Sequence, residues 1–466
     1  MIIDIMKLFP FFLILICIFA MPGIFNFVIV IPLLIIMFIC FYSMNLQTSN
    51  TITAYLIKKD KTTRILAMFV MWMFLSYIVN FIISGYSFSH FLLTFSFGYF
   101  FNFIACFLLG IFVANFISTK TLIKVLTLAL MIILFFAMIE IIMFLNHIPG
   151  LENFIALSAG RTPADILQYK YEGFPRIQSF FNEPSHFAWF LTCNIPIVLT
   201  IARSKFKIFT NLIFNKFVKI TILPLWLISL IYTQSAIFLI FSCIIFYIYY
   251  VQMLRVSKKM FLLQILMALT ILLCFICIIT TVDISDTYLR RIVNTLQSFG
   301  NFQIFAIVEP SLATRIIHWV NMFIISIHHP IFGISCGNLE NYFPMQLMHS
   351  PLPYTKEVLI ADILTKQPRA VLPSIFFRIL ADNGFVGSMI FYTFLFSIYN
   401  NSQKLYTYNN TFSKEYFKAV SFSILIFIVL TIYDSQLYNH YFWVMFGIVT
   451  GIYIKERLAF AKGVIK

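Results

Sequence analysis

A short polar stretch stands out in an otherwise strongly apolar chain, where residues 173–190 read GFPRIQSFFNEPSHFAWF. Three of its side chains have chemistry that an apolar segment does not need: Arg176, Glu183 and His186. The planar guanidinium of an arginine suits bidentate contacts with phosphate oxygens. A carboxylate or an imidazole can take a proton from a hydroxyl group. The stretch therefore holds candidates for anion binding and for general-base catalysis.

The residues Asn182, Glu183 and Pro184 predict the start of a helix. A capping-type residue is followed by a proline, whose missing N–H costs nothing in the first helical turn. The free amides of that turn favour anions, so they stabilise the ionised carboxylate and make Glu183 a weaker base than burial would. The alternative interpretation is an ion pair between Arg176 and Glu183 that caps the helix without taking part in a reaction.

A second group of polar side chains lies in SLATRIIHWVNMFIISIHH, residues 311–329. At 100° per residue they form one narrow stripe on an otherwise apolar helix, interrupted by Met322. The members of the stripe are Ser311, Arg315, His318, Ser326 and His329. Such a helix lies in the membrane interface or folds back into the protein. Its stripe then either faces bulk water or lines a cleft that holds a polar ligand.

The stripe is followed by HPIFGISCGN, a turn with two glycines, and later by PSIFFRILADNGFVG at residues 373–387. The latter predicts a short amphipathic half-helix that carries Arg378 and is broken at Asn383-Gly384. A charge near a bilayer is costly and usually has a partner or a function. The structural partner predicted for Arg378 is Asp382, four residues further along the helix.

The elements that position these residues are membrane helices. The chain has 466 residues, of which 61% are hydrophobic and 11% charged, whereas a soluble domain has about 45–50% apolar and about 25% charged residues. A helix needs about 20 mostly apolar residues to cross the hydrocarbon core. The sequence therefore predicts an all-α polytopic membrane protein with about twelve transmembrane helices. They lie near 8–20, 22–42, 64–84, 91–117, 121–145, 184–201, 217–232, 235–254, 260–280, 384–399, 416–433 and 439–454.

The distribution of charge predicts the orientation, because Lys and Arg accumulate in cytoplasmic loops. With the N-terminus inside, the seven cytoplasmic segments together hold 22 basic and four acidic residues, whereas the two long opposite-side loops hold nine basic and ten acidic residues. Both termini are thus predicted to be cytoplasmic. The same asymmetry accounts for the net charge of +15, so a nucleic-acid partner is not needed to explain it.

The predicted organisation alternates membrane and external regions. The two long external loops are expected to carry short amphipathic helices, and they contain most of the candidate site residues. The predicted divisions are helices one to five at 1–145, a first external loop at 146–183, helices six to nine at 184–280, a large external loop at 281–383, and helices ten to twelve with a cytoplasmic tail at 384–466.

Several function classes have no support in the sequence. It contains no Walker-type or GxGxxG glycine pattern, which argues against an ATP-driven transporter. Only Cys336 of the eight cysteines lies in an external loop, so no disulfide framework is predicted. The pair Asp283 and Asp286 is isolated, and no metal ligand set and no cofactor are expected.

Three blocks together resemble the bacterial O-antigen polymerases (Wzy type) and the related O-antigen ligases. The first runs from Arg176 to Phe187 (R-x-x-x-x-F-x-E-P-S-x-F). The second starts with R-x-x-x-W at Arg315 and ends with H-P-I-F-G-I-S-x-G-N at Asn338. The third ends in A-D-N-G-F-V-G at Gly387.

The resemblance implies a glycosyltransferase of the inner membrane, with its active site facing the periplasm or the cell exterior. A polymerase of this kind moves a growing glycan from undecaprenyl diphosphate to a hydroxyl of the next lipid-linked repeat unit of an O-antigen or capsule. The partners implied are these lipid-linked glycans, the bilayer, a chain-length regulator and a flippase.

The roles of the candidate residues follow from the same resemblance. Family members rely on arginines in the external loops, and matching positions here are Arg176, Arg315 and Arg378, as ligands of the diphosphate. The attacking hydroxyl needs a base. The candidates for it, between which the sequence does not decide, are Glu183, His186 and His318.

Two alternative functions are a ligase and a transporter. A ligase would transfer the finished glycan to an anchor, and is expected to carry a His-Asn pair just before the tenth span, where this chain reads Arg369-Ala-Val-Leu-Pro373. A transporter would place charges at mid-membrane and show related halves, yet Glu140 alone is clearly intramembrane and no halves match. Polymerase is the favoured interpretation, although Arg315 is followed at eleven positions by Ser326 instead of the glycine typical of polymerases.

Overall fold

The computed structural model describes most of the chain as helices, with no strand in the described ranges. Those ranges are 2–18, 60–145, 177–181, 183–203, 207–253, 298, 300–308, 310–353, 374–408, 411–433 and 439–461. The helices are α1 (Ile2–Ile18), α4 (Lys61–Ser84), α5 (Phe88–Thr94), the π-helix η2 (Phe95–Ala105), α6 (Cys106–Phe116), α7 (Thr119–Leu145), α10 (Pro184–Cys193), α11 (Ile195–Arg203), α12 (Leu212–Tyr232), α13 (Ala236–Met253), α16 (Phe302–Val308), α17 (Pro310–His328), α18 (Leu339–Met348), α20 (Ile375–Tyr408), α21 (Thr411–Leu430) and α22 (His440–Ala461).

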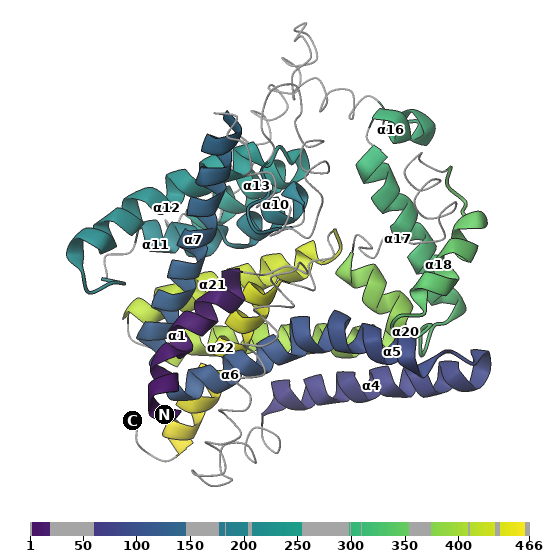
Figure 1. Ribbon diagram of the computed structural model, residues 1–466, viewed down its shortest axis with the longest axis horizontal. Helices are drawn as coiled ribbons and strands as arrows, with labels where there is room; N and C mark the ends of the chain where they lie inside the picture. Colours follow the sequence, from purple (N-terminus) through teal and green to yellow (C-terminus); the bar gives the residue numbers. More distant parts are fainter. Residues whose placement is uncertain are drawn as a thin grey trace, which may run out of the picture.

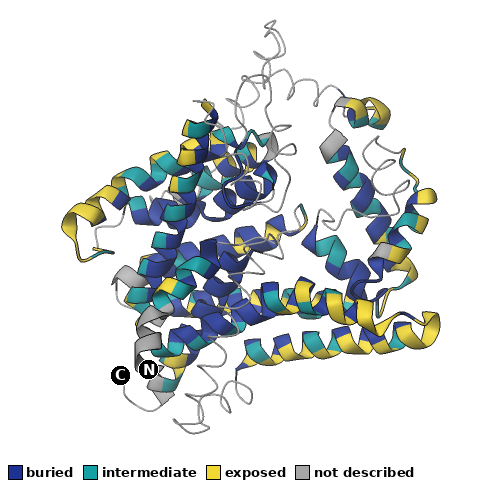
Figure 2. Cartoon of the chain, in the orientation of Figure 1, coloured by how far each residue is buried: buried dark blue, intermediate teal, exposed yellow. Residues whose placement is uncertain are grey.

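The predicted class, an all-helical membrane protein, is confirmed. Five described helices are long and apolar enough to cross a membrane, and a sixth span results if α10 and α11, which meet at a bend of 52°, are counted together. These six coincide with the spans predicted near 64–84, 91–117, 121–145, 184–201, 217–232 and 384–399. Apolar side chains on the outer face of α4, such as Ile82 and Ile83, are largely exposed, as expected for a surface that contacts lipid (Figure 2).

The remaining predicted spans divide into two groups. Helices α1, α13, α21 and α22 overlap the positions predicted at 8–20, 235–254, 416–433 and 439–454, but none of the four is among the described helices that are long and apolar enough to cross a membrane. The spans predicted at 22–42 and 260–280 lie outside the described residues, as do most of the first long loop and part of the second.

Helices α6 and α22 pack closely against each other in the described core (Figure 1). A Cβ atom added at Gly110 would collide with the backbone of Val444, and one at Gly447 would collide with the carbonyl of Phe107. Small residues at such a crossing let two backbones approach, which is the main source of helix association where lipid tails are as apolar as the side chains. This pair anchors the helices around it, including η2, which continues directly into α6.

Helix α20 is broken at Gly384, as the sequence predicts, and the break is paired with the turn that follows α17. Gly384 has φ 67° and ψ −175°, a backbone conformation that only glycine adopts readily. Around it, the Phe385 N–H donates to the Pro330 carbonyl (2.8 Å) and the Ile334 N–H donates to the Ala381 carbonyl (2.9 Å). The turn and the broken helix are therefore held together by backbone hydrogen bonds, which place α17 beside α20.

A substitution at Gly384 tests this pairing. In Gly384→Ala the new Cβ would overlap the Ile331 carbonyl, so we expect a loss of more than about 3 kcal/mol of stability, or failure to accumulate, from backbone strain and collision together. Gly85→Ala is the matched control, because Gly85 also has positive φ (65°) but nothing lies within 4 Å of its Cβ position; it should cost only about 1–2 kcal/mol. Thermal unfolding in detergent measures both, and equal losses would contradict the proposed pairing.

Candidate functional site

The segment that leads into α10 is anchored by Glu140 of α7. The buried Glu140 carboxylate accepts hydrogen bonds from the backbone N–H groups of Gln178 (3.1 Å) and Ser179 (2.7 Å). The Ile177 N–H donates to the carbonyl of Tyr232 at the end of α12 (3.1 Å). Buried polar groups are tolerated when hydrogen bonds satisfy them, and here the bonds also fix the chain a few residues before Glu183. The intramembrane carboxylate therefore has a structural partner.

Glu183 lies at the start of α10, which begins at Pro184 as predicted. Its side chain makes no capping bond to the helix backbone. Instead, its Oε2 accepts a hydrogen bond from the Ser185 hydroxyl (3.2 Å) and lies 3.9 Å from Nε2 of His186. The Glu183 side chain is 35% exposed, whereas that of His186 is 4% exposed. Of these two candidate bases, Glu183 is thus the one that a substrate can reach directly.

Arg315 joins this helix start from the second long loop. Its Nη2 donates to the Ser185 hydroxyl (3.3 Å), a contact between residues 130 positions apart in the chain. Its guanidinium also lies over the ring of Tyr433, 4.9 Å from the ring centroid, a favourable cation–π distance. We call Glu183, Ser185, His186, Arg315 and Tyr433 the Glu183 cluster. It brings together three residues, Glu183, His186 and Arg315, that the sequence singled out in two separate stretches.

The middle part of the polar stripe is buried, so α17 folds back into the protein there, whereas His329 at the end of the stripe is partly exposed. Arg315, His318 and Ser326 are all buried. The His318 ring packs edge-on against Phe343 of α18, at 5.0 Å between ring centroids. His318 therefore follows Arg315 along the same face, but its ring contacts α18.

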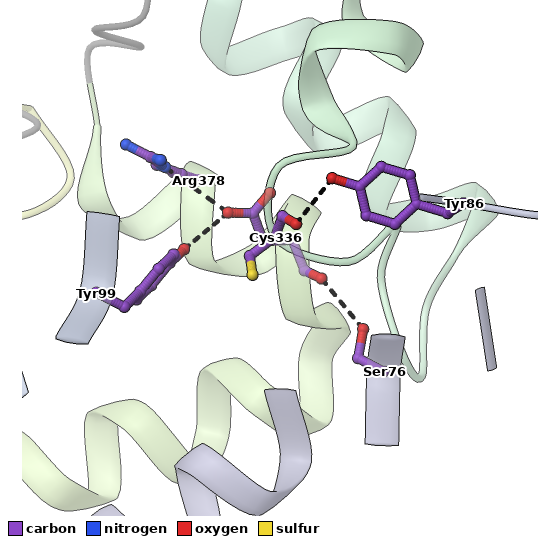
Figure 3. A network of polar contacts seen from close by, with 6 residues as sticks. Ser76, Tyr86, Tyr99, Cys336 and Arg378 are labelled. Atoms are coloured by element: carbon purple, nitrogen blue, oxygen red, sulfur yellow. Dashed lines mark hydrogen bonds and ion pairs between the residues drawn. The ribbon is translucent and has the colours of Figure 1, made fainter. Parts of the chain in front are cut away.

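Arg378 belongs to a second group, the Asp382 cluster, which consists of Tyr99, Arg378 and Asp382 (Figure 3). Arg378 Nε lies 3.7 Å from Asp382 Oδ2, which confirms the predicted i, i+4 pair. The Tyr99 hydroxyl donates to the same oxygen (2.7 Å), and the Arg378 guanidinium lies 5.8 Å from the Tyr99 ring centroid. A phosphate bound by Arg378 would compete with the Asp382 carboxylate.

The hydrogen bonds around the Asp382 cluster hold the turn that follows α17 against its neighbours. Tyr86 donates to the Cys336 carbonyl at 3.2 Å (Figure 3). Ser76 donates to the Phe332 carbonyl (2.6 Å), so α4 and the residues just after it hold the turn in place. Burial raises the pKa of the Cys336 thiol well above its usual value. The thiol is therefore protonated near neutral pH and is not a nucleophile.

Aromatic side chains connect the two clusters. The Trp319 ring lies 5.9 Å from the ring of Phe377, the neighbour of Arg378, and 5.9 Å from that of Tyr433. Because Trp319 is one helical turn after Arg315, α17 packs both against Tyr433 of the Glu183 cluster and against the residue next to Arg378 in the chain.

Sequence reasoning missed Ser185, Tyr433 and Tyr99 as neighbours of the charged groups. The sequence held an indication for Tyr433, which ends the span predicted at 416–433. The predicted topology puts the residues that follow it, 434–438, on the same side of the membrane as the two long loops. For Tyr99 the only signal is structural: it lies in the π-helix η2, an uncommon element that is frequent at functional sites. The same π-helix carries Asn102, whose Oδ1 lies 2.8 Å from Nε2 of the buried His440.

Arg176 lies outside the described residues, so its part in the site stays a prediction. Its neighbour Ile177 is described, and the backbone bonds of the following residues fix where the segment enters the protein. Among the described residues, no group of three or more His, Cys, Asp or Glu side chains has the arrangement of a metal site.

The Glu183 cluster combines a reachable carboxylate, a buried histidine beside it and a buried arginine held by a hydroxyl and an aromatic ring. Such a set can bind an anion through the guanidinium and accept a proton at the carboxylate. Comparisons of the whole chain with protein-family models and with curated proteins find no match.

Proposed function

We propose that this chain is a membrane glycosyltransferase that polymerises undecaprenyl-diphosphate-linked oligosaccharide repeat units into a surface polysaccharide. The observation that carries the proposal is the contact between Arg315 and the Glu183-Ser185-His186 helix start. It pairs a phosphate-binding group with a carboxylate that can accept a proton, within a chain of apolar helices. A lipid-linked substrate would reach such a site from the bilayer.

In the proposed reaction, the hydroxyl oxygen of one lipid-linked repeat unit attacks the anomeric carbon of another glycan. A new glycosidic C–O bond forms while the C–O bond to the diphosphate breaks, and the diphosphate leaves with the bonding electrons. Arg315, with Arg176 as its predicted companion, stabilises the negative charge on the leaving diphosphate. The proton of the attacking hydroxyl goes to Glu183, and His186 at 3.9 Å can share it.

Among the three predicted bases, the geometry favours Glu183. His186 and His318 are buried, whereas about a third of the Glu183 side chain is exposed. A general base must come within hydrogen-bond reach of the proton it removes. Glu183 can do so without a rearrangement of α10 or α17.

We further propose the twelve-span arrangement with both termini cytoplasmic and the Glu183 cluster on the external side. The excess of basic residues in the predicted cytoplasmic segments supports it. Glu183 at the end of the first long loop and Arg315 of the second lie together at the start of α10. This agrees with both loops being on the same side of the membrane. A reporter fused after Lys207 that reads external would contradict this arrangement.

Deletion of the gene tests the function directly. We expect the ladder of surface polysaccharide on a gel to collapse to a single repeat unit on its carrier, and a plasmid copy of the gene to restore the ladder. Complete polymer that accumulates on the carrier and is missing from its anchor would indicate the ligase instead. Repeat units that accumulate only on the cytoplasmic face would indicate a transporter, and an unchanged ladder would reject all three functions.

A further inference from the structure

A small pocket opens between the end of α17 and α18, which pack against each other at the right of Figure 1. Its volume is about 240 Å³, near the low end of small-molecule sites. The polar residues that line it are His328, His329, Tyr342, Gln346 and His349. None of them takes part in the Glu183 cluster or the Asp382 cluster. The pocket thus requires an explanation of its own.

The side chains that line the pocket offer groups for hydrogen bonding. His349 Nδ1 lies 2.9 Å from the Met345 carbonyl; since a carbonyl only accepts, Nδ1 carries a proton in this contact. Gln346 donates to the side chain of Asn321 (3.5 Å), which leaves its carbonyl oxygen as an acceptor. Burial and the neighbouring His328 lower the pKa of His329, so that ring is neutral near pH 7.

The composition of the pocket argues against charged ligands. No Lys, Arg, Asp or Glu is among the described residues that line it, and Lys and Arg are the usual cationic groups for binding phosphate. Its histidines do not form a metal site, since no such group of ligands exists among the described residues. Neutral donors and acceptors around the ring of Tyr342, which offers an apolar face and a polar tip, fit a neutral, hydroxyl-rich molecule.

The position of the pocket relates it to the proposed reaction. Thirteen residues of α17 separate Arg315 from His328, which is about 20 Å along a helix at 1.5 Å per residue. A sugar bound there would be distant from the reacting diphosphate. Only an extended glycan could occupy both places, and its distal units would then lie at the pocket.

From this geometry we infer that the pocket between α17 and α18 binds a neutral sugar unit of the lipid-linked glycan, distal to the reacting end. The inference rests on the proposed function for its choice of glycan. Binding at a distance from the reacting bond adds affinity and helps to orient the substrate. The pocket would act as a binding subsite, without a role in bond formation.

The test is binding of a defined probe to the purified full-length protein in detergent. The probe is an oligosaccharide prepared by partial hydrolysis of the organism's own surface polysaccharide, free of lipid and phosphate, and titration calorimetry or ligand-observed NMR measures its affinity. We expect Tyr342→Ala and His349→Ala each to weaken binding at least tenfold. His349 is exposed, so its replacement leaves the packing of α18 intact. Met348→Ala is the matched control, because Met348 is exposed on the same helix and does not line the pocket.

Arg315→Ala separates this inference from the proposed function. It should lose chain extension but bind the free oligosaccharide as well as the wild type does, because the probe lacks a diphosphate. If the wild-type protein does not polymerise repeat units but Tyr342→Ala still abolishes sugar binding, the proposed function is wrong and the sugar subsite is supported. If polymerisation is present but the wild type does not bind the probe, or if both pocket variants bind it unchanged, the subsite is wrong and the function stands.

Discussion

Replacement of Arg315 by alanine should abolish detectable chain extension while the protein still accumulates in the membrane. The guanidinium is held between the Ser185 hydroxyl and the Tyr433 ring, so its charge is in place before substrate binds. Loss of a single preorganised group that stabilises transition-state charge typically costs about 10²–10³-fold in rate. Arg315→Lys should recover only part of the activity, because an ammonium keeps the charge but loses the planar fork. Extension of purified lipid-linked repeat units in vitro measures the effect.

Because Arg315 is buried, its replacement could also disturb packing, and two further variants separate the causes. Arg315→Met keeps an unbranched apolar stem of similar reach and removes only the charge and the donors. Arg64→Ala removes an exposed arginine at the start of α4, on the predicted cytoplasmic side, and should be fully active. Near wild-type extension by Arg315→Met, with an unchanged melting temperature, would show that the guanidinium only packs against Tyr433.

Glu183→Gln should lose most polymerisation with little change in stability. The amide keeps the shape of the side chain and an oxygen that accepts the hydrogen bond of the Ser185 hydroxyl, but it cannot take a proton. Loss of a general base costs about 10²–10⁴-fold in rate. If Glu183 only pairs with a neighbouring cation at this partly exposed position, the loss is about 0–1 kcal/mol. The two interpretations therefore predict activities that a single assay of initial rate can separate.

Ser185→Ala provides the comparison for Glu183→Gln. It removes the hydroxyl that both Arg315 and Glu183 contact, yet it leaves the carboxylate as a base. We expect a smaller loss of rate than for Glu183→Gln, because the reacting groups remain and only their alignment suffers. If both variants polymerise at equal rates near that of the wild type, Glu183 is not the general base and has only a structural role at the start of α10.

The sequence by itself determined the features that depend on neighbours along the chain. Apolar runs predict membrane helices because a helix is the structure that satisfies every backbone group within one segment in lipid. The start of α10 at Pro184 and the break of α20 at Gly384 follow from backbone geometry. The pair of Arg378 and Asp382 follows from helical spacing, because residues four apart lie on the same face.

Only the tertiary structure decided which helix faces pack against one another. The helical pattern of α17 placed Arg315 and His318 on one stripe, but water, lipid or protein could all have covered that stripe. The contact of Arg315 with Ser185, the ring of Tyr433 beneath it and the anchoring of Gln178 by Glu140 join segments far apart in the chain. Such contacts depend on how helices pack, which is set by the shapes of whole surfaces and by close approaches such as that of α6 and α22. Local spacing carries no information on these long-range distances, so the candidate residues could be identified from the sequence but their assembly into one site could not.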